Sequence, residues 1–323
     1  MSSWRSWHRP LMLFAALMVA TGLLSAGGLL LDDRTLVGSP IWFKPFKFSV
    51  SLLAYALSLA WMLSLVTRAR RAAWWAGTVI ALTGTVEMVL IIGQVLRGRR
   101  SHFNHETAFD SALYDVMGLS VAVLWTAALV IAVLLFRSRL ADRASAWALR
   151  LGSVIALAGA GVGFLMAQPT AAQRASMGDG PLDVVGAHSV GVPDGGPSMP
   201  LTGWSTTGGD LRIPHFVGMH ALQVLPLLLL VLAALAPHLP RLGTETVRVR
   251  LVLTASGGYA GLLALVTWQA LRGQPLLRPD AVTLALGAAL VAGTLLAGLA
   301  ALRAGAGSPP DPAAVQRREA ASA

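Results

Sequence analysis

The sequence predicts an all-α, polytopic membrane protein built as a bundle of eight transmembrane helices. It is 55% hydrophobic and only 12% charged, whereas a soluble protein is about a quarter charged. Uncharged apolar runs of roughly 20 residues recur along the chain, and each is long enough to cross a bilayer as a helix. These runs occupy residues 11–31, 42–66, 73–96, 113–136, 146–167, 214–236, 249–271 and 281–303.

The first run is too long for the core of a signal peptide and is followed at once by Asp32 and Asp33, so we expect it to be retained as a helix. The membrane domain is predicted to cover residues 1–303, with its principal motif in the loop 168–213. The tail 304–323 lacks apolar periodicity and is predicted to be a disordered cytoplasmic segment.

Charge placement predicts the orientation. With both termini in the cytoplasm, the inner segments carry 15 basic residues against four acids, and the outer segments carry ten of each. This distribution follows the positive-inside rule. Orientation therefore accounts for the net charge of +10 without a nucleic-acid partner.

A short internal repeat is visible. The third run ends in Gln94–Gly98 and the seventh in Gln269–Gly273, each reading Gln-x-Leu-Arg-Gly with one small difference, Val95 against Ala270. Pro-Phe at 45–46 and Pro-His-Phe at 214–216 open the second and sixth runs. The match favours two parallel four-helix halves, although coincidence explains so few residues equally well.

Glycine-rich stretches at 159–163 and 257–261 lie inside apolar runs. The first resembles a nucleotide-binding fingerprint on paper, but no strand precedes it. We expect both stretches to let membrane helices pack closely.

The absence of cysteine excludes disulfides, thiolate metal sites and iron–sulfur clusters. A divalent metal or haem would need histidine or carboxylate ligands, and the candidates are His102, His105, His188 and His215. His102 and His105 have the spacing of one helical turn. An ordinary solvated loop is the alternative for this pair.

Five polar residues are candidates for binding a cofactor or an anionic or lipid-soluble small molecule: Lys44, Lys47, Arg97, Arg212 and Gln223. The two lysines are the only ones among 25 basic residues, which suggests that a compact ammonium is needed. The alternative is that they belong to an interfacial belt with the neighbouring aromatic residues.

Glu87, Asp210 and His220 are the candidate catalytic residues. A carboxylate or imidazole inside a membrane span is costly, so each is expected to face the protein interior and a partner. Glu87 shares a helix face with Gln94, and either a proton path or a structural hydrogen bond would explain it. Asp210 would handle protons, cap the sixth helix or pair with Arg212. His215 and His220 would point roughly 140° apart on a regular helix.

Several motifs resemble those of a widespread family of bacterial multi-pass membrane proteins that has no assigned reaction. They are Trp42–Pro45, Arg97–Gly98 with Ser101–Asn104, and the run His188, Asp194–Pro197, Trp204–Thr206, Gly209–Arg212, His215–Phe216, His220 and Gln223. The resemblance implies a bacterial inner-membrane location. The layout is also similar to haem A synthase, but runs 42–66, 113–136 and 281–303 lack its paired histidines.

Together these observations favour a membrane enzyme with an outward-facing site, dependent on a metal or haem. A transporter or ligand sensor without catalysis, or a structural subunit of a membrane complex, remains the alternative. The sequence gives no indication of the oligomeric state.

Overall fold

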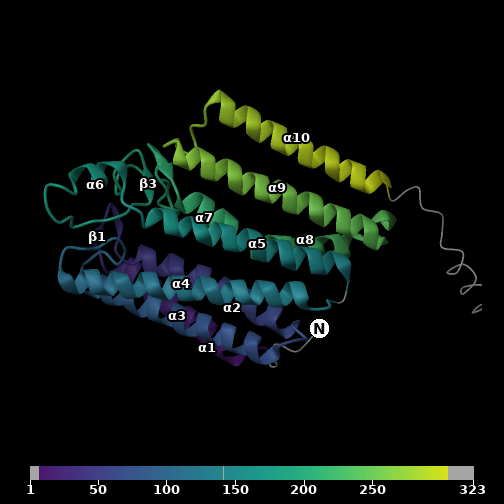
Figure 1. The fold of residues 1–323 in the computed structure, drawn as a ribbon, viewed down its shortest axis with the longest axis horizontal. Helices are drawn as coiled ribbons and strands as arrows, with labels where there is room; N and C mark the ends of the chain where they lie inside the picture. Colours follow the sequence, from purple (N-terminus) through teal and green to yellow (C-terminus); the bar gives the residue numbers. More distant parts are fainter. Residues whose placement is uncertain (1–6, 141, 305–323) are drawn as a thin grey trace, which may run out of the picture.

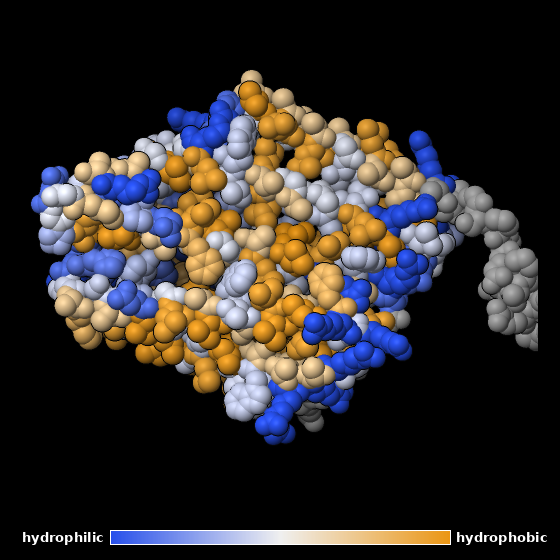
Figure 2. Space-filling view, in the orientation of Figure 1, coloured by the Kyte–Doolittle hydropathy of each residue, from blue (hydrophilic) through white to orange (hydrophobic). Residues whose placement is uncertain are grey.

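The computed structural model describes residues 7–140 and 142–304. The long helices lie side by side, and the start of the first and the end of the last lie at the same end of the bundle (Figure 1). Apart from Ala304, the predicted disordered tail lies outside the described residues. Figure 2 shows an apolar band across the middle of the molecule with hydrophilic residues gathered towards both ends, as expected for a chain that spans a bilayer.

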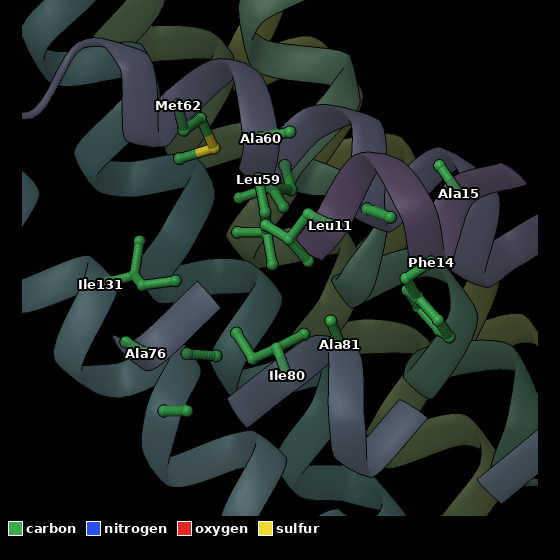
Figure 3. Packing of buried hydrophobic residues seen from close by; sticks show 14 of the residues in the cluster. Leu11, Phe14, Ala15, Leu59, Ala60, Met62, Ala76, Ile80, Ala81 and Ile131 are labelled. Atoms are coloured by element: carbon green, nitrogen blue, oxygen red, sulfur yellow. The ribbon is translucent and has the colours of Figure 1, made fainter. Parts of the chain in front are cut away.

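The first half consists of α1 (Arg9–Leu31), α2 (Phe43–Ser64), α3 (Arg70–Leu96) and α4 (Ala108–Arg137). Their facing sides form the largest apolar core, part of which is drawn in Figure 3. Leu11 of α1, Met62 of α2 and Ile80 of α3 are each fully buried in this core. Such interdigitation matters in a membrane, where lipid is as apolar as leucine and packing drives helix association.

The second half consists of α5 (Arg143–Met166), α7 (Arg212–Met219), α8 (Ala221–Leu235), α9 (Glu245–Leu271) and α10 (Ala281–Ala304). A short helix, α6 (Ala171–Ser176), lies in the loop after α5, and a 3₁₀ helix, η2 (Pro240–Gly243), precedes α9. Within the described ranges, seven helices are long and apolar enough to cross a membrane, or eight if α7 and α8 form one span. The all-α polytopic prediction is confirmed.

The sixth predicted span, 214–236, is not one straight helix, because α7 and α8 meet at 41°. His220 is both the last cap of α7 and the first cap of α8. Pro226 has no N–H to donate to the Leu222 carbonyl and its ring crowds that oxygen, which favours a bend in this region. Gly218 lies directly against Gly159 of α5, and Ala221 at the start of α8 lies against Gly152 of the same helix, so both parts of the bent span pack on α5.

Two small antiparallel ladders shape the end of the bundle opposite the N-terminus. The first joins β1 (Thr35–Leu36) and β2 (Ser39–Pro40), and the second joins β3 (Ser189–Val190) and β4 (Gly209–Asp210). Gly38, with φ of +72°, makes the first turn, and a Cβ there would lie 2.6 Å from the Gly195 carbonyl oxygen. The β1–β2 turn therefore packs against the long loop of the second half.

The predicted repeat extends into three dimensions. Helices α3 and α9 each contain 27 residues. They end in the same way, since Gly98 has φ of +68° and Gly273 has φ of +71°. Gln94 and Gln269 both accept, at their backbone carbonyls, an N–H from five residues later, at 2.9 and 3.2 Å.

Ion pairs follow at matching positions. Arg97 pairs with Asp110 in the first turn of α4, and Arg272 pairs with Asp280, which caps α10. In each half the first span packs on the second and third, and the third packs on the fourth. These correspondences support the arrangement of two parallel four-helix halves.

The glycine stretches act as predicted. A methyl group on Gly159 would overlap Gly218 in α7, and one on Gly258 or Gly261 of α9 would overlap Thr294 or Leu290 of α10. Close helix approach is what small residues permit in membrane proteins.

We therefore expect Gly159→Ala to lower the thermal unfolding temperature in detergent. The added methyl meets backbone atoms that cannot turn away, an overpacking cost of about 1–3 kcal/mol. Gly93→Ala is the matched control, because a Cβ there meets no atom within 4 Å. Equal unfolding temperatures for the two variants would contradict the packing of α7 on α5.

Candidate functional site

Asp194 organises the long loop around His188. Its Oδ2 accepts hydrogen bonds from the His188 backbone N–H at 3.0 Å and from His188 Nδ1 at 2.9 Å, and its Oδ1 accepts one from the Ser189 N–H at 2.8 Å. A carboxylate can only accept, so Nδ1 carries the proton in neutral His188 and Nε2 carries the lone pair. Asp194 therefore fixes both the ring and its tautomer.

A continuous chain of rings joins Lys44 to His188. The Lys44 ammonium lies 5.8 Å from the Phe48 ring centre, and Phe48 lies 5.9 Å from His102. His102 in turn lies 6.1 Å from Phe103, which contacts His188 edge-on at 4.9 Å. The contacts bring together α2, the segment between α3 and α4, and the loop before α7.

His215 approaches the same group from α7. Its Nδ1 donates to the Gly159 carbonyl oxygen at 2.9 Å, and Gly163 of α5 lies beside the ring. Because a carbonyl oxygen accepts only, the lone pair of neutral His215 is on Nε2. His102, His188 and His215 are close enough to interact electrostatically with one another. We call Lys44, Glu87, His102, His188 and His215 the outer cluster.

Glu87 is the deepest member of the outer cluster. It is 4% exposed, and neither carboxylate oxygen has a hydrogen-bond partner among the described residues. It interacts electrostatically with Lys44 across the α2–α3 interface. The structural hydrogen bond considered for Glu87 from sequence is therefore not formed by any described residue.

Asp210 and Arg212 brace the loop. Asp210 is 1% exposed, and it accepts hydrogen bonds from Ser205 N–H and, on both oxygens, from the Arg212 guanidinium. Arg212 also donates to the Gly203 carbonyl oxygen at 2.6 Å, and Lys47 donates to that of Thr202 at 2.7 Å. Of the roles expected for Asp210, the structure forms the ion pair with Arg212.

Arg97, Gln94 and Asp110 form a separate buried network where α3 ends and α4 begins. Arg97 donates to Asp110 and to the Gln94 side chain, each at 2.6 Å, and Gln94 donates to Asp110 at 2.9 Å. Asp110 is fully buried. Arg97 thus joins the end of α3 to the start of α4. The helix face that carries Glu87 and Gln94 ends at this network.

His105 and His220 have other neighbours. The expected helical turn at 102–105 is absent, since the described helix α4 begins only at Ala108 and Phe103 has φ of +60°. His105 shares a hydrogen bond with Ser111 at 2.7 Å. His220 donates to Gln223, which donates to Ser58 of α2 at 3.1 Å, so this predicted pair links α8 to α2.

A metal site of three protein ligands is not formed in this arrangement. Among the described residues, no group of three or more His, Cys, Asp or Glu side chains is placed to hold a metal ion. What the outer cluster does present is imidazole nitrogens with lone pairs, one ammonium and one carboxylate. These groups are suited to hydrogen bonding and proton transfer.

Burial controls the charge of the site's loop residues. It lowers the pKa of His188, against the opposing effect of the hydrogen bond to Asp194. Burial also lowers the pKa of His102 well below its usual value, reinforced by the charges of Lys44 and His188. Burial would raise the pKa of Asp194, but hydrogen bonds from His188 outweigh it and keep the pKa low. At neutral pH the imidazoles are therefore neutral and Asp194 is ionised.

Sequence reasoning did not identify three members of this site. The sequence analysis names Asp194 and Phe103 only within longer motifs and gives them no role, and it does not name Phe48. Phe103 lies in the Ser-His-Phe-Asn motif directly beside His102, so its position was a usable signal. The six-residue spacing between His188 and Asp194 is not a pattern that predicts a contact between them.

Comparisons of this chain with protein-family models, curated proteins and solved structures give no match.

Acid should destabilise the protein through these histidines. An imidazole whose pKa is lowered by folding binds protons more readily when unfolded, so stability is lost as the pH falls below about 6.5. We expect the unfolding temperature to drop between about pH 7.5 and 5.5, and His102→Gln to reduce that drop. Ser176→Ala, whose hydroxyl bonds to Ala172 and Gln173 of α6 and not to an imidazole, should retain the full pH dependence. A His102→Gln slope as steep as the original would contradict this assignment.

Proposed function

We propose that the protein is a membrane-embedded enzyme that performs acid–base chemistry on the polar head of a lipid-soluble or anionic substrate. The observation that carries the proposal is the His188–Asp194 pair, in which Nδ1 is held by a carboxylate and Nε2 keeps its lone pair. A histidine fixed in this way is suited to act as a general base.

Lys44 supplies the complementary charge. No hydrogen bond from its ammonium to another described residue is formed, and it lies within electrostatic reach of Asp194, Glu87 and His102. An ammonium in such a position can hold an anionic group or stabilise negative charge that develops when His188 removes a proton. Lys44 would therefore orient the substrate, and His188 would react with it.

Haem or metal dependence is the second candidate, favoured by one specific observation. In both His188 and His215, Nδ1 is hydrogen-bonded to an oxygen acceptor. The lone pair on Nε2 of each ring is therefore the one that could bind a metal or haem iron. Ligating histidines are oriented by such partners. A Soret band, or stoichiometric metal in the detergent-purified protein that is lost in both His188→Ala and His215→Ala, would favour this candidate.

The orientation proposed from charge can be tested in a background that has no cysteine. Thr207 is exposed in the long loop, and Arg139 is exposed at the other end of the bundle. We expect Thr207→Cys to react with a membrane-impermeant maleimide in intact cells, and Arg139→Cys to react only after lysis. The reverse pattern would place the outer cluster on the cytoplasmic side.

A bound molecule provides the test of function. We expect the purified protein to retain a small molecule, detected by mass spectrometry of its organic extract. Lys44→Ala should reduce its amount by about tenfold or more, because a hydrogen bond to a charged group contributes about 1.5–3 kcal/mol. His188→Ala should reduce it by about threefold or more, because a hydrogen bond to a neutral group contributes about 0.5–1.5 kcal/mol.

His238→Ala is the control for this extraction, since His238 is exposed at the opposite end of the bundle. Its extract should equal that of the unmodified protein. Extracts that are identical for all four proteins would overturn the proposed function.

A further inference from the structure

A groove with a volume of about 460 Å³ runs between α3 and α4 on the outside of the bundle. Small side chains line it, including Ala76 and Ala127, which are 7% and 8% exposed. The larger side chains of Trp75 and Val130 also line it and remain exposed. Because alanine does not fill the space between two packed helices, this pair leaves a furrow that an apolar chain can enter. We call it the α3–α4 groove.

One end of the α3–α4 groove is basic. The groove follows α3 from Ala72 to Val79, about two turns, and Arg71 directly precedes it. On α4, Arg137 lies seven residues beyond Val130 and therefore on the same helix face. Both arginines are exposed, at the end of the bundle where the N-terminus lies (Figure 1). The groove is thus apolar along its length and basic where the two helices reach the end of the bundle.

The arginines at this end have no acidic partner. Five of them lie where α2 ends, α3 begins and α4 ends: Arg68, Arg70, Arg71, Arg137 and Arg139. None of the five forms an ion pair within residues 7–140 and 142–304. Of the nearby acids that the structure describes, Asp142 accepts from Ser145 N–H and Glu245 accepts from Arg143 N–H, both in the first turn of α5. The end of the groove therefore carries positive charge that the described protein does not neutralise.

Hydrogen-bond donors accompany this charge. Ala69, at the N-cap of α3, has φ of +51° and supplies no side-chain hydrogen bond, so the first N–H groups of α3 lack the acceptor that a Ser, Thr or Asp cap would provide. The Trp75 indole contacts Trp74 edge-on at 4.9 Å, and its N–H has no hydrogen-bond partner among the described residues. Tryptophan is enriched at the level of lipid head groups.

We infer that the α3–α4 groove binds an anionic phospholipid, with an acyl chain along the groove and the phosphate between Arg71 and Arg137. Basic residues beside a groove between transmembrane helices bind the head groups of anionic lipids. A second copy of the chain fits less well, because two copies in the same orientation would bring these arginines against each other, and like charges repel. The inference concerns the opposite end of the bundle from the outer cluster and is independent of the proposed function.

A second groove, between α9 and α10, provides an internal comparison. Its volume is about 340 Å³, and Trp268 lines it together with apolar residues. The neighbouring Arg272 contacts the Trp268 ring and pairs with Asp280. Because this arginine already has an acidic partner, we expect no preference for an anionic lipid at the α9–α10 groove.

The test is native mass spectrometry of the delipidated protein in detergent, titrated in parallel with dioleoyl phosphatidylglycerol and dioleoyl phosphatidylcholine. We expect the first phosphatidylglycerol to bind at least about tenfold more tightly than phosphatidylcholine. Combining Arg71→Gln with Arg137→Gln should reduce this preference to about twofold or less, because each arginine contributes about fivefold, the factor that corresponds to about 1 kcal/mol.

The matched control combines Arg241→Gln with Arg250→Gln, which removes two exposed charges at the same end of the bundle, from η2 and α9. This variant should keep the full preference. An equal loss in both double variants would show that net charge alone sets the preference, and would overturn the inference. Equal affinity of the unmodified protein for the two lipids would overturn it as well.

A groove-filling substitution tests the position of the acyl chain. Thr126 is exposed within the groove, and Thr126→Phe should weaken phosphatidylglycerol binding by about fourfold or more, the factor for about 0.8 kcal/mol, or one buried methylene. Leu119→Phe, on α4 but outside the groove, should leave the affinity unchanged. Unchanged affinity in Thr126→Phe, or a dimer of the unmodified protein that Thr126→Phe dissociates, would overturn the inference, the latter by assigning the groove to a second copy.

Discussion

The structure of the outer site depends on the Asp194 carboxylate. It accepts three hydrogen bonds from two consecutive residues, His188 and Ser189, and so ties a glycine- and proline-rich loop into one conformation. The same contact sets the tautomer of His188 and leaves its Nε2 lone pair available. Without this carboxylate, the loop would lose its anchor and the imidazole its orientation, since both effects come from the same two oxygens.

The site is composite, because neither half of the chain supplies it alone. Lys44, Glu87 and His102 come from the first half, whereas His188 and His215 come from the second, His188 from the long loop between α5 and α7. Placement of a polar site where two repeats meet is common in duplicated membrane proteins. The aligned position of Glu87 in α9 is Leu262, using the match of Gln94 with Gln269, so the deep carboxylate belongs to one half only.

The sequence was sufficient to predict the membrane fold, since hydropathy reports directly on the length of each span. It also predicted the glycine contacts between helices and singled out all five residues of the outer cluster, because polar residues in an apolar chain are conspicuous. It could not predict the break at His220 or the role of Asp194. Both depend on contacts between segments distant in sequence or on loop geometry, and a Pro-Asp-Gly-Gly turn reads the same whether or not its carboxylate holds a histidine.

The most direct test of this account is a density map of the purified protein from electron cryo-microscopy, recorded with its co-purified molecules. The account predicts non-protein density within hydrogen-bonding distance of His188 Nε2 and the Lys44 ammonium. A map without such density, in which protein side chains occupy the positions next to His188 Nε2 and the Lys44 ammonium, would contradict it.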